Sequence, residues 1–267
     1  MDLQLSGRRA LITGGSRGIG LACARALLAE GAAVGLVARG QEALDAAAET
    51  LRAEFPGATV AVVAADSADD AQVRRAVDAL VAELGGIDIL INGAARVAGS
   101  AAIPRYDELT DDEMRMELEI KLLGYLRFAR AVGPLMAANG WGRIINIAGL
   151  AARSAGGIST SVRNVAVAAM TKNLADELGP HGVNVTVVHP GLTVTERTPG
   201  MIQGVAAMRG LSEDDAEKAL GANISIGRMI TAEEVADVVT FLASPRSVSI
   251  TGDAITVGGG SKGPIYY

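Results

Sequence analysis

Short apolar runs rich in β-branched residues alternate along this chain with longer stretches in which apolar residues recur every three or four positions. The short runs predict strands, and the longer stretches predict amphipathic helices. The predicted strands are Arg9–Thr13, Ala33–Ala38, Thr59–Ala64, Ile87–Asn92, Gly142–Ala148, Val183–His189 and Ala254–Val257. The predicted helices lie around Ile19–Glu30, Gln41–Phe55, Ala68–Leu84, Asp111–Ala138, Ser159–Leu178 and Ala232–Ala243. This alternation predicts an α/β fold, a doubly wound parallel sheet with helices on both faces.

The pattern runs through residues 1–267 without a Pro/Ser-rich linker, a charge run or an internal repeat. We therefore expect one domain, although the length alone also allows two small ones. The least regular segment is about 195–226, which contains several glycines and the acidic run Ser212–Asp215. Long irregular segments in compact domains often cover a site, so this one is predicted to be a substrate lid, with a plain surface excursion as the alternative.

The charge, the cysteine and histidine content and the apolar runs of the chain argue against several classes of function. The formal net charge of −6 argues against a nucleic-acid or anionic-membrane surface and leaves a small-molecule substrate as the expected partner. The single Cys23 excludes an intrachain disulfide and fits the core of a protein in a reducing compartment. No apolar run is long enough to span a bilayer and no signal peptide is evident, so a cytoplasmic protein is predicted. His181 and His189 belong to no Cys/His/Asp cluster, so no metal site is expected.

A glycine-rich segment, Thr13–Gly20, follows the first predicted strand and opens the first predicted helix. Its glycines allow the backbone to turn sharply and to approach a pyrophosphate, while the helix N-terminus offers free N–H groups and a positive dipole. The alternative is a tight strand-to-helix turn that binds nothing. The sequence thus predicts a dinucleotide site, with cofactor-binding residues Gly14, Ser16, Arg17, Gly18, Ile19 and Gly20.

The order Thr-Gly-x-x-x-Gly-x-Gly resembles the cofactor loop of the short-chain dehydrogenase/reductase family, and the resemblance covers nearly the whole chain. Further matching segments are Asp66, Ile87–Asn92, Pro190-Gly191 through Thr195, Gly227-Arg228, Glu233–Ala236 and Gly252. The resemblance implies a Rossmann-type sheet of about seven strands that holds a nicotinamide cofactor, and a homodimer or homotetramer. It also implies that Asp66 contacts the adenine, that Thr195 contacts the nicotinamide carboxamide, and that Asn92, Pro190 and Gly191 belong to the cofactor site.

The end of the second predicted strand bears on which nicotinamide cofactor is preferred. An acid at this position would bind the ribose hydroxyls and repel a 2′-phosphate, but the residue there is Ala38, followed by Arg39. Arg17 in the glycine loop can reach the same phosphate. Two guanidinium groups without a carboxylate favour NADP(H) over NAD(H), unless both arginines are ordinary surface residues.

In the resembled family a Tyr transfers the proton, a Lys lowers the pKa of that Tyr, a Ser binds the substrate oxygen, and an Asn completes a water relay. The helical segment Lys172–Leu178 fixes the alignment and places Thr160 at the Tyr position and Asn164 at the Lys position. Gly149, after the run 145–148, stands at the Ser position, and Lys121, within 120–124, stands at the Asn position. All four differ from the family pattern, and no Tyr occurs between Tyr125 and Tyr266. Because general acid–base catalysis contributes about 10²–10⁴-fold, ordinary carbonyl reduction is disfavoured.

Of the four residues that differ from the family pattern, Lys121 has the side chain that could take part in the most kinds of reaction. Next to a bound cofactor it could stabilise an enolate or alkoxide, or act as a base if burial lowers its pKa. Alternatively its ammonium group reaches solvent or pairs with Glu117, four residues earlier. Tyr125 follows one turn later and either packs in a helix interface or serves as an acid.

Other residues could also contribute to a substrate site. Arg96, Arg153 and Arg163 could bind an acidic substrate or lie in solvent, and Tyr266 or Tyr267 could reach a neighbouring subunit.

The sequence is compatible with three functions. The first is an NADP(H)-dependent oxidoreductase with atypical proton chemistry, which reduces an activated C=C bond or a carbonyl of a small molecule. The second is an inactive cofactor-binding partner of an active relative, and the third is a redox-neutral lyase or isomerase.

Overall fold

Seven parallel strands form the centre of the structure, a computed structural model that describes residues 1–95 and 104–262. Their order across the sheet is β3-β2-β1-β4-β5-β6-β9. The strands are β1 (Arg9–Thr13), β2 (Ala33–Ala38), β3 (Val60–Ala64), β4 (Ile89–Asn92), β5 (Gly142–Ile147), β6 (Val183–Pro190) and β9 (Ala254–Val257). A separate two-stranded ladder pairs β7 (Thr193–Val194) with β8 (Ile230–Thr231).

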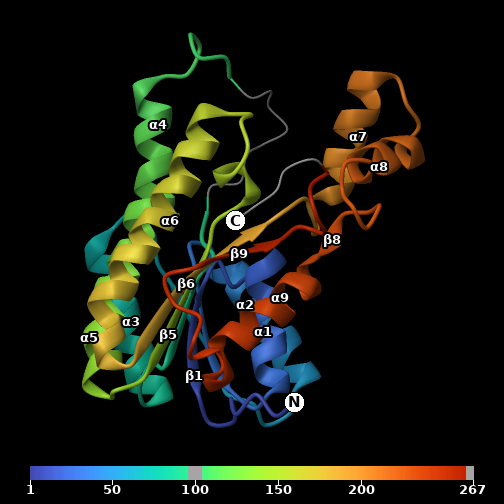
Figure 1. Cartoon of the computed structure of the whole chain (residues 1–267). Coiled ribbons are helices and arrows are strands. Elements are labelled where there is room, and N and C mark those ends of the chain that lie inside the picture. The colour runs from blue at the N-terminus through green and yellow to red at the C-terminus, as the bar shows by residue number, and fades with distance from the viewer. Residues whose placement is uncertain (96–103, 263–267) are drawn as a thin grey trace.

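Helices cover both faces of the large sheet (Figure 1). On one face pack α1 (Gly18–Ala29), α2 (Gln41–Glu54) and α9 (Ala232–Ala243). On the other face pack α3 (Asp70–Leu84), α5 (Gly124–Ala138) and α6 (Ile158–Leu178). Single 3₁₀ turns lie at Leu150–Ala152, Gly179–His181 and Pro245–Ser247. The predicted doubly wound α/β fold is therefore confirmed.

One helix approaches the sheet closely because a glycine of the sheet faces it. A Cβ at Gly35 in β2 would lie 2.7 Å from a methyl carbon of Leu80 in α3, so only glycine lets this helix pack where it does. The core contains few aromatic side chains, and Cys23 is fully buried in it, as predicted. Burial raises the pKa of the Cys23 thiol to about 12, so it is an unreactive core residue.

The predicted helix Asp111–Ala138 is divided in the structure. It consists of α4 (Asp111–Glu117), a π-helical segment η1 (Leu118–Leu123) and α5. The wider turn of η1 changes the direction in which the side chains after it point. This feature has no apolar periodicity of its own, and the sequence pattern therefore reads as one uninterrupted helix.

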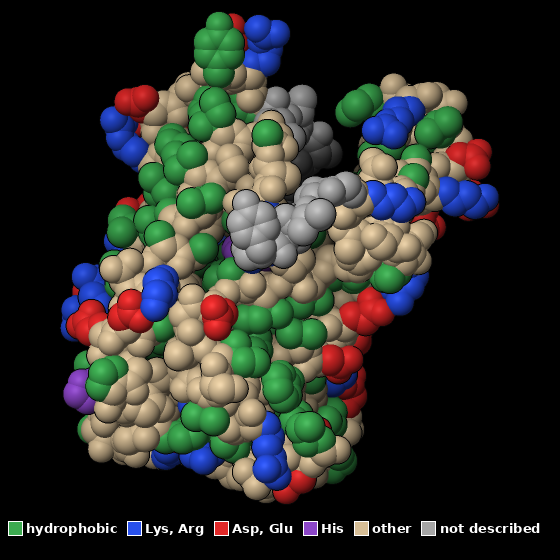
Figure 2. Space-filling model, viewed as in Figure 1, with side chains coloured by type: hydrophobic (Ala, Val, Ile, Leu, Met, Phe, Trp, Pro, Cys, Tyr) green, Lys and Arg blue, Asp and Glu red, His purple; other side chains and the backbone are tan. Residues whose placement is uncertain are grey.

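The segment 195–226, which the sequence indicated to be irregular, is largely helical. It contains α7 (Thr198–Arg209) and α8 (Glu213–Gly221). The local signals for these helices are present: a proline in the first turn of α7, and the Ser212 side chain, which accepts the Asp215 N–H at the start of α8. Because glycines are typical of loops, the glycines of this segment outweighed these signals and the two helices were not predicted. Figure 1 shows α7 and α8 projecting beyond the sheet, across from α4 and the start of α6, and Figure 2 shows a hollow between these two projections.

A chain of buried amides joins the middle of the sheet to α6. Asn92 Nδ2 donates to Asn146 Oδ1 at 2.9 Å, and Asn146 Nδ2 donates to the Thr171 hydroxyl at 2.9 Å. All three side chains are fully buried. Because buried amides are costly when unpaired, this chain fixes how the ends of β4 and β5 lie against α6.

No helix in the described parts of the chain is both long and apolar enough to cross a membrane.

We expect Asn146→Ala to lower the free energy of unfolding by about 1–3 kcal/mol, because it removes one of the two buried hydrogen bonds of the Thr171 hydroxyl and the shorter of the two made by the Asn92 amide. Urea unfolding measures the change. Asn173→Ala on the exposed face of α6 is the matched control, for which a change within about 0.5 kcal/mol is expected. Equal destabilisation by both substitutions would contradict this role of the buried chain.

Candidate functional site

A cavity of about 1030 Å³ opens at the carboxyl ends of the central strands. Its walls come from the glycine loop, the ends of β2, β4, β5 and β6, the start of α6 and the segment that contains α7 and α8. Most of the predicted site residues line it: Gly14, Ser16, Arg17, Gly18, Ile19, Gly20, Arg39, Asp66, Lys121, Gly149, Thr160, Asn164, Pro190, Gly191 and Thr195. Asn92 does not, because its side chain is turned into the buried amide chain beneath the cavity.

The glycine loop packs so closely against neighbouring backbone that it has no room for side chains. A Cβ at Gly14, where φ is +71°, would lie 2.9 Å from the Gly93 carbonyl carbon, and one at Gly20 would collide with the Gly14 carbonyl oxygen. The Thr13 hydroxyl accepts the N–H groups of Gly93 and Ala94 at 3.0 and 3.1 Å, which holds the loop after β4 against it. The first turn of α1 has no side-chain cap and no acidic residue of its own. Its free N–H groups and dipole therefore suit an external anion.

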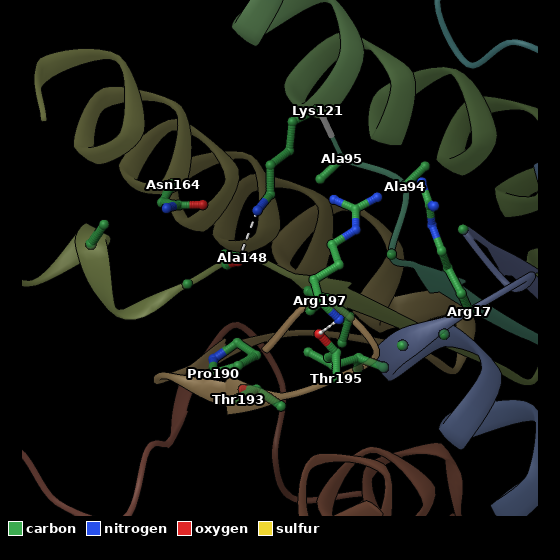
Figure 3. A pocket seen from close by; sticks show the side chains of 18 of the residues that line it. Arg17, Ala94, Ala95, Lys121, Ala148, Asn164, Pro190, Thr193, Thr195 and Arg197 are labelled. Atoms are coloured by element: carbon green, nitrogen blue, oxygen red, sulfur yellow. Dashed lines mark hydrogen bonds between the residues drawn. The ribbon is translucent and has the colours of Figure 1, made fainter. Parts of the chain in front are cut away.

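Lys121 brings a positive charge into the opposite wall. It lies in the π-helical segment η1, is 4% exposed, and its Nζ donates to the Ala148 carbonyl oxygen at 2.8 Å (Figure 3). Burial lowers the pKa of this ammonium group to about 7. The two alternatives in which Lys121 reaches solvent or pairs with Glu117 are wrong, since Lys121 is buried and Glu117 pairs with the buried Arg163 instead.

One peptide unit joins Lys121 to a histidine. The carbonyl of the Ala148–Gly149 peptide accepts from Lys121, and its N–H donates to His189 Nδ1 at 3.4 Å. Burial, and next the positive charge of Arg153, lower the pKa of His189 to about 4, so its imidazole is neutral. Our sequence reasoning weighed His189 only as a metal ligand and missed this contact. Its position before Pro190-Gly191 was the one available signal.

Gly149 and Asn164 fit against each other. A Cβ on Gly149 would lie 3.2 Å from Asn164 Nδ2, a tight contact, so the absence of a side chain at 149 makes room for the amide at 164. Asn164 is 2% exposed, and its Oδ1 has no hydrogen-bond partner among the residues described. A buried acceptor without a partner is costly, and here it lines the cavity, where a ligand hydroxyl or amide could satisfy it.

Tyr125 does not take part in the cavity. It is 1% exposed, and its hydroxyl donates to the Ile147 carbonyl oxygen at 2.9 Å. Burial raises the pKa of this phenol well above its ordinary value. Tyr125 therefore packs in the helix–sheet interface, and the alternative that it serves as an acid is not supported.

Basic side chains outnumber acidic ones around the cavity. Its charged lining residues are Arg17, Arg39, Asp66, Lys121, Arg163, Glu196, Arg197 and Arg209. Of the other arginines considered in the sequence, Arg153 donates to the Ala254 carbonyl oxygen, while Arg96 lies outside the described residues, as do Tyr266 and Tyr267. Such a lining suits an anionic ligand.

Within residues 1–95 and 104–262, no group of three or more His, Cys, Asp or Glu side chains could hold a metal ion.

Comparisons with known proteins agree with this geometry. A family model described as enoyl-(acyl carrier protein) reductase matches residues 14–262. The short-chain reductase protein NovJ of Streptomyces niveus is 36% identical over 252 residues, which cover 94% of this chain and 92% of NovJ. The NADPH-dependent reductase BacG of Bacillus subtilis is 30% identical over 259 residues, 96% and 98% of the two chains. L-sorbose reductase from Gluconobacter frateurii, solved with NADPH and L-sorbose, has a TM-score of 0.91 at 31% identity, covering 99% of this chain and 100% of the reductase.

The depressed pKa of Lys121 predicts a specific pH dependence of stability. Below about pH 7 the lysine is protonated in both the folded and the unfolded chain, and folding must bury a charge. This cost disappears as the pH rises from about 7 towards the ordinary lysine value of 10.5. Lys121→Met should therefore gain stability relative to the unaltered protein near pH 6, and the gain should shrink towards pH 9.

Urea unfolding of both proteins across this pH range measures the difference. Lys172→Met is the control, since Lys172 is exposed and pairs with Asp176 on the same helix. Its effect should be nearly constant over the same range. A pH-independent effect of Lys121→Met would show that the buried ammonium group does not titrate as described.

Proposed function

This chain belongs to the short-chain dehydrogenase/reductase family, and we propose that it is an NADPH-dependent reductase acting on a carbonyl or an activated C=C bond of a small molecule. The relatives named above are reductases, and one of them was solved with NADPH and a sugar. The observation that carries the proposal is the buried Lys121 ammonium group, which lines the cavity and has a pKa of about 7.

The residues present fit a dinucleotide. The glycine loop, which exposes backbone to the cavity, and the free N–H groups of α1 suit a pyrophosphate. Pro190, Gly191, Thr195 and Asp66 line the same cavity. Ala38, Arg39 and Arg17 at the adenosine end favour a 2′-phosphate over a free ribose. When bound, NADPH supplies a hydride.

Lys121 would supply the matching proton. An ammonium group has three N–H donors, and only one of them is used by the Ala148 carbonyl oxygen. Another can donate to a substrate oxygen, stabilise the negative charge that develops there, and transfer its proton, which leaves a neutral amine. With a pKa of about 7, this amine can regain a proton from water near neutral pH.

The proposed site is atypical because the residues at the positions of the family's Tyr, Lys and Ser cannot donate the proton. Thr160 has a hydroxyl that does not ionise near neutral pH, and Gly149 has no side chain. Asn164 can accept a hydrogen bond through its unpaired Oδ1 and so orient a ligand hydroxyl. The segment 195–226 contributes Met201, Ala219 and Leu220 to the cavity wall, which supports the proposal that it covers the substrate.

The central test is Lys121→Met, assayed with NADPH and a panel of small ketones and enones. We expect kcat/KM to fall by about 10²–10⁴-fold, because the proton donor is lost. In the unaltered enzyme, kcat/KM should decrease as the pH rises through about 7, since the acid form of Lys121 is then lost. Deuterium-labelled NADPH shows by mass spectrometry whether the hydride adds to a carbonyl carbon or to a C=C bond.

Lys172→Met should leave both the rate and its pH profile unchanged. An unaltered rate for Lys121→Met would remove Lys121 from the mechanism. Tight NADPH binding without consumption by the unaltered protein would instead favour an inactive cofactor-binding partner, or a redox-neutral enzyme if the substrate is isomerised or cleaved.

The cofactor preference gives a separate prediction. Arg39→Gln should weaken NADPH binding by about tenfold and change NADH binding little, because only NADPH carries the 2′-phosphate. Nicotinamide fluorescence titration measures both affinities. Arg25→Gln is the control, since Arg25 is outside the cavity and pairs with Glu54. Equal weakening of NADPH and NADH by Arg39→Gln would contradict the assignment.

A further inference from the structure

Two adjacent residues of opposite charge, Glu196 and Arg197, stand between β7 and α7 and line the cavity. A tight turn holds the backbone there. Thr195 N–H donates to the Thr198 hydroxyl at 2.8 Å, and Thr198 N–H donates to the Thr195 carbonyl at 3.0 Å. The Thr198 side chain is buried, so the turn is anchored. The positions from which the two charged side chains extend are therefore fixed.

The Glu196 carboxylate lies against the glycine loop. A Cβ built on Gly18 would lie 3.8 and 3.9 Å from its two carboxylate oxygens, and Gly18 is the first residue of α1. This helix end has no acid in its first turn, and its N-cap residue is the basic Arg17. An anion is favourable at such a position. In the structure Glu196, from a distant part of the chain, places a carboxylate beside this helix end.

Arg197 extends into the same cavity towards Arg17. Figure 3 shows the two side chains reaching in from the glycine loop and from the segment after β7. Partial burial, and next the positive charge of Arg17, lower the pKa of Arg197, while Glu196 opposes this. Neither guanidinium group makes a hydrogen bond or ion pair with any residue that the structure describes. Two unbonded guanidinium groups that repel each other across a cavity are stabilised by an anion between them.

We propose that Glu196 and Arg197 form an anion-exchange gate for the dinucleotide. In the free protein the Glu196 carboxylate occupies the position of the pyrophosphate. The incoming pyrophosphate displaces this carboxylate and takes Arg197 as its counter-ion. Glu196 thus lowers the affinity for the dinucleotide and Arg197 raises it. The inference rests on the dinucleotide binding in the proposed function. It concerns the pyrophosphate, which NADH and NADPH share, and not the 2′-phosphate.

Fluorescence titration with NADPH and with NADH tests the gate in the full chain. Glu196→Gln should tighten binding of both dinucleotides by about three- to tenfold, because the competing charge is gone. Arg197→Gln should weaken both by about 10- to 100-fold, the loss typical of a charge-assisted hydrogen bond. The second effect should shrink as salt is added. Arg25→Gln, which lies outside the cavity and pairs with Glu54, is the control and should change neither affinity.

The outcomes separate this inference from the proposed function. Opposite shifts in the two variants, equal for NADPH and NADH, support the gate. A shift confined to NADPH would assign Arg197 to the 2′-phosphate and overturn it. Tight binding by the unaltered protein, with no change in either variant, would overturn the gate and leave the proposed function intact. If the unaltered protein binds neither dinucleotide, both fail.

Discussion

All seven strands of the large sheet run in one direction, and this constraint places the functional chemistry of the molecule at one edge. The carboxyl ends of β1, β4, β5 and β6 come together there, so the loops that follow them must share a single space. The buried amide chain from Asn92 through Asn146 to Thr171 fixes two of these ends against α6.

The Ala148–Gly149 peptide that follows β5 organises the reactive side of the cavity. Its carbonyl accepts from Lys121 and its N–H donates to the neutral His189, so the polar atoms at both ends are paired. The π-helical segment η1 supplies the geometry that brings Lys121 to it from the far side of the cavity. A carbonyl can partner an ammonium group or a neutral amine, which allows Lys121 to change its protonation state in place.

Much of this molecule could be predicted from its sequence. Strands such as β1, β2 and β9 match their predicted bounds because each is a short run dominated by apolar residues. The helices α7 and α8 were missed because their glycines outweighed two local capping signals. The sequence indicated that Lys121 and Asn164 face one space, but their burial and the unpaired Asn164 oxygen depend on packing between distant elements. Glu196 reads as a surface acid in the sequence, since its contact with Gly18 spans most of the chain.

The packing of Gly149 against Asn164, together with the ammonium group of Lys121 beside them, has a consequence for how this site can change over generations. A side chain at position 149 would press on the Asn164 amide, and a lysine at 164 would put a second cation into a buried space that already holds one. Each change alone is therefore disfavoured unless a neighbour changes with it. The side chains at these three positions therefore constrain one another, and a stable exchange at one requires a compensating exchange at another.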